Sequence, residues 1–196
     1  MEALDYKINA IRKKINLLVA SPISKERSLN PPISEREIVE IEQYYQITFP
    51  SEYRAFITTI ANGGFVPYYG LLSLQDSLKY FREVKQNKRL KQDYLKVPFI
   101  HTSTYDPDED PYILELGEKC DRGEIPESEC DRVYDYLIAG TMAISLEGCG
   151  YYRFIVITGP TRGQVWFNAD AGDGGYIPLN LSFLDWYEKW LDEYFQ

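Results

Sequence analysis

The apolar pattern in the second half of the chain predicts a β-sheet. Three apolar runs, residues 142–147, 151–158 and 164–168, are separated by two glycine-rich turns, 148–150 and 159–163. The middle run is dense in β-branched and aromatic residues, and its length suits a central strand better than a helix. Glycine supplies the positive φ and proline the fixed φ of tight connections, so the runs predict an antiparallel meander. A sheet this apolar must be covered by helices.

The first 20 residues carry one apolar stripe with basic residues between its members, Leu4, Ile8, Ile11, Ile15 and Leu18. Spacings of three and four indicate an amphipathic helix. A basic amphipathic helix could bind an acidic membrane surface, cover its own sheet or meet a partner helix. Because the stripe lacks the Trp and Phe of interfacial anchors, we predict core packing. We divide the chain into an N-terminal helical extension, residues 1–30, and an α+β domain, residues 31–196.

Capping residues ahead of apolar positions at helical spacing predict four further helices. Ser34 and Glu37 form a capping box, in which each side chain bonds the backbone N–H of the other residue. The second of these helices begins at Pro50-Ser51-Glu52 and ends at Asn62-Gly63-Gly64. The third begins at Asp76 or Ser77 and runs to about Asn87, and the last begins at Ser182, which caps it together with Asp185. The apolar face of the last helix predicts burial of Trp190, as the meander does for Trp166.

Shorter segments complete the expected fold. Strands are predicted at residues 69–74 and 97–101, a strand edge at 112–116, and loops at 102–111, 117–131 and 170–175. The fold class that follows is α+β, a single domain with a largely antiparallel sheet flanked by helices and an extra amphipathic helix at the N-terminus.

Composition places the chain among ordinary globular proteins. Of its 196 residues 44% are hydrophobic and 26% charged, and no apolar run approaches the roughly 18 residues of a membrane span. The acidic start of the chain is unlike a signal peptide, so we expect a cytoplasmic protein. Three cysteines, Cys120, Cys130 and Cys149, form no CxxC pair, and this spacing favours reduced thiols in that compartment.

Charge narrows the class of partner. The formal net charge is −9, and residues 101–136 hold twelve acids against three basic residues. Binding to nucleic acid requires clustered Lys and Arg, so a basic protein partner is more plausible than nucleic acid. A charge run that serves only solubility is the plainer alternative.

Candidate catalytic and metal sites fail on spacing. The lone His101 gives no catalytic triad, and with Cys149 it forms a dyad only if the fold brings the two together. Neither a zinc site from His101 and the cysteines nor a calcium loop from Asp106 matches the ligand spacings, because Pro111 and Gly117 stand where an EF-hand needs Gly and Glu. We therefore expect no enzyme activity and no cofactor. The 17 tyrosines, several beside acids, suit a binding surface.

The order of several motifs is that of a known family. They are the Ser34 helix cap, Phe49-Pro50-Ser51-Glu52-Tyr53, Asn62-Gly63-Gly64, Gly70-Leu71-Leu72, Gly148-Cys149-Gly150, Gly163-Gln164-Val165-Trp166 and Ser182-Phe183-Leu184-Asp185-Trp186. Over residues 34–195 this combination resembles the SUKH superfamily, which includes the yeast cell-wall assembly regulator domain and many bacterial immunity proteins. Residues 1–30 lie outside the resemblance, and residues 101–136 match it loosely. Phe49 stands where the family usually has Leu.

The resemblance implies an α+β fold and a protein that acts by binding. Bacterial members often neutralise a cognate polymorphic toxin, commonly a nuclease, in the cytosol; a regulatory adaptor that binds a cellular protein is the alternative. A nuclease presents Lys and Arg to phosphate, so an acidic surface can occupy that site. The predicted partner-binding residues are Tyr105, Asp106, Asp108, Glu109, Asp110 and Tyr112, with Asp170 and Asp173 as a second cluster.

Overall fold

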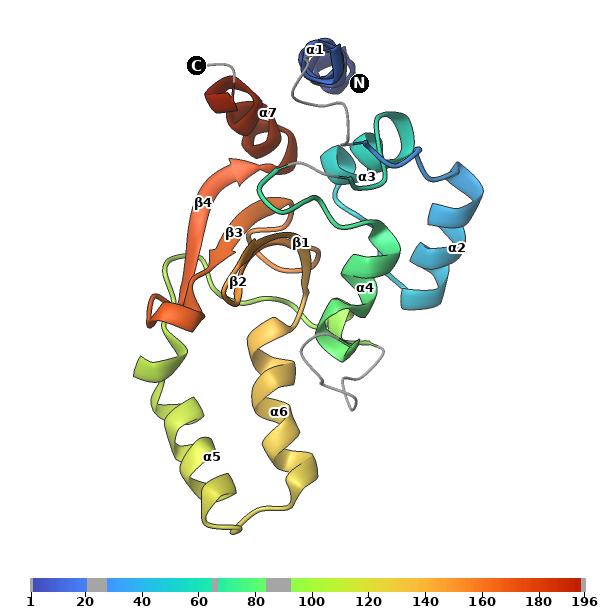
Figure 1. The fold of residues 1–196 in the computed structure, drawn as a ribbon. Coiled ribbons are helices and arrows are strands. Elements are labelled where there is room, and N and C mark those ends of the chain that lie inside the picture. The colour runs from blue at the N-terminus through green and yellow to red at the C-terminus, as the bar shows by residue number, and fades with distance from the viewer. Residues whose placement is uncertain (1, 21–27, 65–66, 84–92, 195–196) are drawn as a thin grey trace.

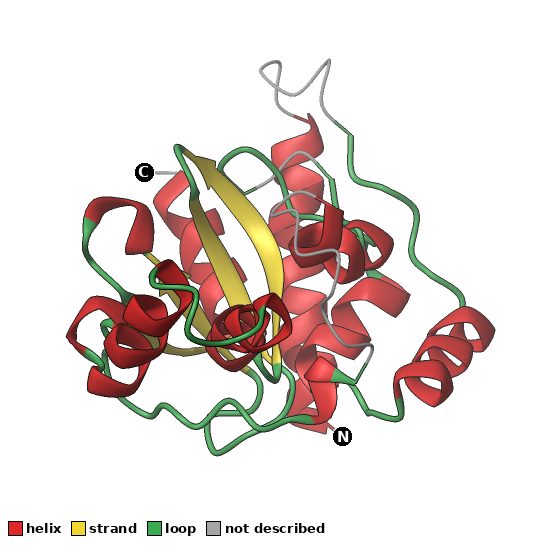
Figure 2. Cartoon of the chain, turned by 90° about the horizontal axis from the view of Figure 1, so that it is seen from below, coloured by secondary structure: helices red, strands yellow, loops and turns green. Residues whose placement is uncertain are grey.

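A four-stranded antiparallel sheet of order β1-β2-β3-β4 forms the centre of the protein (Figure 1). The computed structural model describes residues 2–20, 28–64, 67–83 and 93–194. The strands are β1 Thr141–Gly148, β2 Tyr151–Val156, β3 Gln164–Asn168 and β4 Tyr176–Ser182. In the view of Figure 2 the strands lie in the middle of the molecule, with helices around them. The predicted meander and the α+β class are confirmed.

The register of the sheet explains why the middle run is so apolar. Ile155 of β2 lies opposite Met142 of β1 and Val165 of β3, while Phe154 lies opposite Trp166. All five side chains are buried, so both faces of β2 are covered at this level. A central strand buried on both faces needs apolar residues at successive positions rather than at alternate ones.

The fourth strand was not predicted. β4 follows a loop and pairs with β3 along its length, but Pro178 and Asn180 interrupt its apolar pattern. Asn180 adopts a left-handed φ of 55°, and the register shifts beside Pro178. Both irregularities are tolerated because β4 is an edge strand, where a missing N–H costs no ladder hydrogen bond.

Seven α-helices surround the sheet in the described ranges: α1 Glu2–Ala20, α2 Glu35–Tyr45, α3 Ser51–Thr59, α4 Leu74–Glu83, α5 Pro111–Asp121, α6 Glu127–Ile138 and α7 Phe183–Tyr194. The capping box of α2 is present as predicted. At the start of α7 the Asp185 N–H donates to Ser182 Oγ, which donates to the Asp185 carboxylate at 2.7 Å. The predicted start of α4 was wrong: its cap is Ser73, whose hydroxyl accepts from the Asp76 N–H. Asn87, its predicted end, lies outside the described residues.

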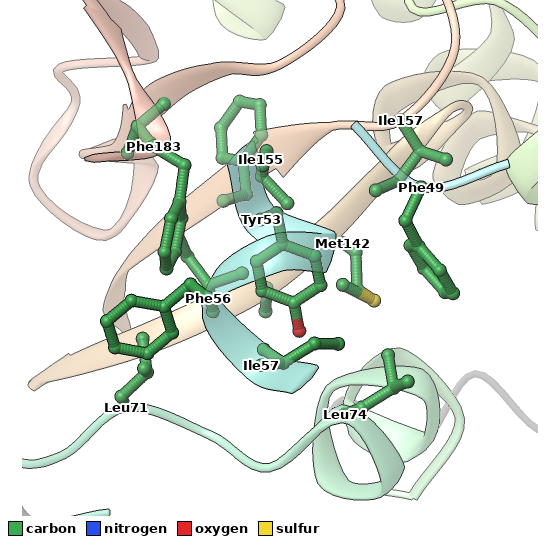
Figure 3. Packing of buried hydrophobic residues seen from close by; sticks show 14 of the residues in the cluster. Phe49, Tyr53, Phe56, Ile57, Leu71, Leu74, Met142, Ile155, Ile157 and Phe183 are labelled. Atoms are coloured by element: carbon green, nitrogen blue, oxygen red, sulfur yellow. The ribbon is translucent and has the colours of Figure 1, made fainter. Parts of the chain in front are cut away.

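The core forms where α3 and α7 meet the sheet. The rings of Tyr53 and Phe56 of α3 both meet the ring of Phe183 of α7 edge to face, at 5.1 and 5.2 Å (Figure 3). Trp166 is fully buried, as predicted. Trp190, which was predicted to be largely buried, is only partly buried: it packs against the core, but its neighbour Leu191 takes the fully buried position in this turn of α7.

Helix α1 packs against α7 and α3 rather than standing apart (Figure 1). Ile8, Ile11 and Ile15 are buried in the common core. Lys7 Nζ donates to Glu52 at 3.0 Å and to Asp185 at 2.6 Å. These contacts support the core-packing interpretation of the basic helix. The division of the chain at residue 30 stays a prediction.

Two predicted strands are absent as strands: one is reduced to a bridge at Leu71 and the other to a single backbone hydrogen bond at Phe99. In residues 69–74 only Leu71 bridges to β1, while the Leu72 N–H donates to the Ile144 carbonyl at 2.8 Å. In residues 97–101 the Phe99 N–H donates to the carbonyl of Thr158, which lies just beyond the end of β2. Phe99 passes so close to Gly159 that a side chain there would collide with its backbone. Leu71 and Phe99 are apolar because both are buried against the sheet, Leu71 beside β1 and Phe99 against Phe154 and Trp166.

The segment from residue 111 to 138 differs most from the prediction. In place of a strand edge at 112–116 and a loop at 117–131, α5 and α6 form a helical hairpin, here called the arm, that projects from the sheet (Figure 1). Cys120 and Cys130 are disulfide-bonded across the hairpin, with Cα atoms 5.7 Å apart. The prediction of reduced cysteines was therefore wrong, because antiparallel helices bring together two thiols that a surface loop would not.

Candidate protein-binding site

The base of the arm is built from two aspartate caps. Asp106 precedes the short 3-10 helix η3, Pro107–Glu109, and its carboxylate accepts from the Asp108 N–H at 3.0 Å. Asp110 precedes α5 and accepts from the Tyr112 N–H at 2.9 Å. A short side-chain acceptor followed by proline is a strong start signal for a helix, because proline lacks the N–H that would go unpaired. These two caps decide the direction in which the arm leaves the domain.

Tyr105 anchors this base to the sheet. Its backbone N–H and C=O pair with Tyr176 of β4 at 3.0 and 2.7 Å. Its hydroxyl donates to Asp110 Oδ2 at 2.8 Å, and its ring stacks on His101 with centroids 3.6 Å apart. The arm is therefore tied to β4 through one tyrosine.

The titration behaviour of the group follows from these contacts. Burial, with a smaller contribution from Asp110, raises the pKa of Tyr105, so its hydroxyl remains a donor. Burial raises the pKa of Asp110, but hydrogen bonds from Tyr105 and from the backbone of residues 112 and 113 outweigh it and hold the pKa below the ordinary value. Burial also lowers the pKa of His101. Asp110 thus stays charged and His101 neutral near pH 7.

The structure brings the two predicted acidic clusters together. The loop between β3 and β4 holds Asp170 and Asp173, and its Gly175 lies against the Tyr105 carbonyl. A Cβ on Gly175 would stand 2.9 Å from Asp106 Cα, which leaves no room for a side chain between the two segments. Two segments some 65 positions apart in sequence therefore lie side by side.

The eight predicted residues divide into two groups. Tyr105, Asp106 and Asp110 are partly buried and make the caps and anchor described above. The others are exposed, and we call them the acidic face: Asp108, Glu109, Tyr112, Asp170 and Asp173. A partner can contact this second group directly, whereas the first group positions it.

The arm extends the acidic face away from the sheet. Among its described side chains, the exposed large apolar ones are Tyr112 at 56% and Leu114 at 49%, both on α5. Its two described basic side chains are paired locally, Lys119 with Glu115 at 2.5 Å and Arg122 with Glu124 at 2.8 Å. The other described acids of the arm are Glu118, Asp121, Glu127 and Glu129. Sequence reasoning missed this surface, although Asp110-Pro111 with Ile113, Leu116 and Cys120 at helical spacing signals a helix.

The remaining candidate chemistry is dispersed. Cys149 is exposed at the tip between β1 and β2, held at a φ of 51°. His101 belongs to the aromatic group beside Tyr105, and Cys120 and Cys130 bond each other. Across the described part of the chain, no group of three or more His, Cys, Asp or Glu side chains is arranged to hold a metal ion. Nor does any helix there combine the length and apolarity of a membrane crossing.

Comparison of the sequence with protein families places the chain in one of them. Residues 32–189 match the SMI1/KNR4 family (SUKH-1). The chain belongs to this family. No curated protein matches the chain. The SUKH-1 match begins just before α2 and ends inside α7, so it includes the sheet, the acidic face and the arm, whereas α1 lies before it.

Membership in SUKH-1 gives the general class of function. Proteins of this family are generally immunity or regulatory proteins that act through protein partners rather than by catalysis. The acidic face and the arm of this SUKH-1 chain expose tyrosine and leucine side chains among charged ones.

Proposed function

We propose that this chain is an immunity protein that binds and neutralises a cognate bacterial polymorphic toxin in the cytoplasm, by contact alone and without a cofactor. The observation that carries the proposal is that the segment holding Asp106 and Asp108 lies against the end of the loop that holds Asp170 and Asp173, at the base of a projecting acidic arm. Charge complementarity favours a partner with a basic surface, and a nuclease must have such a surface to hold phosphate.

The surface suits fast and specific association. Its charges attract a basic partner over a distance of about one Debye length, roughly 8 Å at physiological salt. Exposed Tyr112 and Leu114 then supply the apolar contacts that slow dissociation. Charge therefore governs the association rate, and the apolar side chains govern the lifetime of the complex.

Gene neighbourhood identifies the partner to test. A toxin-like reading frame beside the gene gives the candidate toxin, and co-expression should protect cells from it. Binding to a cellular protein with no such neighbour would instead make the chain a regulatory adaptor. The two outcomes separate the proposed function from its alternative before any kinetic work.

A charge-neutralised variant tests the face itself. We expect Asp108→Asn, Glu109→Gln and Asp173→Asn together to slow toxin association about three- to ten-fold at low salt and to flatten its salt dependence. Truncating Tyr112 to Ala should mainly speed dissociation. Stopped-flow fluorescence at several salt concentrations measures both rates.

The matched control removes three exposed acids from other helices, as Asp5→Asn, Glu40→Gln and Glu193→Gln. It carries the same net charge as the test variant, but α1 and α7 lie at the opposite end of the molecule from the arm (Figure 1). If both variants slow association equally, the effect is one of net charge and the acidic face is not the binding site.

A further inference from the structure

The side chains of the arm that the structure describes form little core of their own. No side chain of α5 is buried, and its inward positions Ile113 and Leu116 are only partly so. Its aromatic contacts lie at the base, where the Tyr136 ring meets His101 at 6.2 Å and Tyr112 at 5.8 Å. Helices of 11 and 12 residues are marginal in water unless tertiary packing stabilises them. The far end of the arm therefore needs another constraint.

The disulfide supplies that constraint at the far end. Cys120 lies in the last turn of α5 and Cys130 in the first turns of α6, 10 positions apart in sequence. The bond links α5 to α6 next to the turn between them, whereas Tyr105 holds the opposite end of the arm, its base, to the sheet. Both cysteines are only partly buried, so a small thiol can reach them. In a compartment that keeps thiols reduced, an accessible disulfide forms and breaks with the redox state rather than persisting as a permanent crosslink.

We propose that Cys120 and Cys130 form a redox clasp that sets the order of the arm. A dithiol reductant breaks the S–S bond, each cysteine sulfur takes up one proton, and the reductant leaves as its own disulfide, a two-electron exchange. The biological consequence rests on the proposed function. The clasped arm is an ordered docking element, whereas the open arm must be ordered during binding and so binds its partner more weakly.

Trypsin tests the clasp without any partner. Lys119 and Arg122 flank Cys120, so two cleavage sites lie at the clasp itself. We expect cleavage after these residues to be at least about ten-fold faster in the Cys120→Ser, Cys130→Ser variant than in the oxidised full chain, because proteolysis follows the population of the locally open form. Cys149→Ser, which removes the cysteine outside the bond, should be cleaved at the oxidised rate. Mass spectrometry of the first fragments gives the rates.

A second measurement separates local opening from general unfolding. The denaturant midpoint of the sheet, followed by tryptophan fluorescence, should change little in the double serine variant, because the described tryptophans lie outside the arm. Equal cleavage rates in the oxidised and double serine proteins, or three free thiols in the full chain under oxidising conditions, would overturn the clasp. Either result would leave the proposed binding function intact. Normal association by the charge-neutralised variant would instead contradict the proposed binding face and leave the clasp intact.

Discussion

Asp110 performs two structural tasks that its place in an acidic run conceals. It caps α5 through the Tyr112 N–H and accepts the Tyr105 hydroxyl, so the charge is directed into the base of the arm. A carboxylate used in this way contributes to local stability more than to the charge offered to a partner. For this reason the residue is excluded from the charge-neutralised variant proposed above.

Acid should loosen the base of the arm through Asp110. Its folded pKa is depressed below 3.8, so its contribution is complete above the unfolded pKa and is lost as pH falls through the folded value. We expect the Tyr105 and Tyr112 ring signals in NMR spectra to shift below about pH 4. Asp110→Ala should show the loosened state already at pH 7, at a local cost of about 1 kcal/mol for the lost cap. An arm base unaffected by either change would show that Tyr105 alone holds it.

The tryptophans test the core residue by residue. Trp166→Ala should lower the free energy of unfolding by about 3 to 5 kcal/mol, because the side chain is fully buried in β3. Trp190→Ala should cost clearly less, about 1 to 2 kcal/mol, since this side chain lies at the edge of the core. Urea denaturation measures both variants, and equal losses would mean that the end of α7 packs as tightly as the sheet.

At the scale of elements, the sequence predicted correctly those helix caps and turns that depend on a few neighbouring residues. The capping box at Ser34, the cap at Ser182 and the glycine turns of the meander are all encoded within a few residues. The edge strand β4 escaped prediction because Pro178 and Asn180 break its pattern, and only pairing with β3 makes it a strand.

The candidate site was predictable in its residues but not in its shape. The acids and tyrosines of 105–112 and of 170–173 stand out in the sequence, yet their meeting depends on the backbone pairing of Tyr105 with Tyr176. No spacing in the chain encodes that pairing. The arm was missed because its acidic content resembles that of a solvated loop, while its half-buried positions are too few to give a strong helical pattern.

Helix α1 should behave as part of the domain. Ile11→Ala should reduce the free energy of unfolding by about 2 to 5 kcal/mol, because its side chain is fully buried among α1, α3 and α7. Leu17→Ala, 66% exposed on the same helix, is the matched control and should change stability by less than about 0.5 kcal/mol. Denaturant unfolding with an unchanged midpoint for Ile11→Ala would support the sequence-based division at residue 30 instead.

At the scale of the whole molecule, the basic residues near the N-terminus are largely committed to internal contacts. Lys14 Nζ lies 2.7 Å from Glu188 and 2.5 Å from Asp192 of α7, and Arg12 donates to the Thr59 carbonyl at 3.1 Å. These pairs neutralise acids of α7 where α1 packs. Residues 101–136 hold twelve acids against three basic residues, so the acidic excess of the sequence is concentrated in the arm and its base.

The opposite placement of α1–α7 and the arm also decides how the protein can be handled (Figure 1). A fusion partner, fluorophore or biosensor linkage attached through α1 or the end of α7 stands on the far side of the sheet. The arm of a chain tethered in this way points into solution, and the attachment leaves the acidic face accessible.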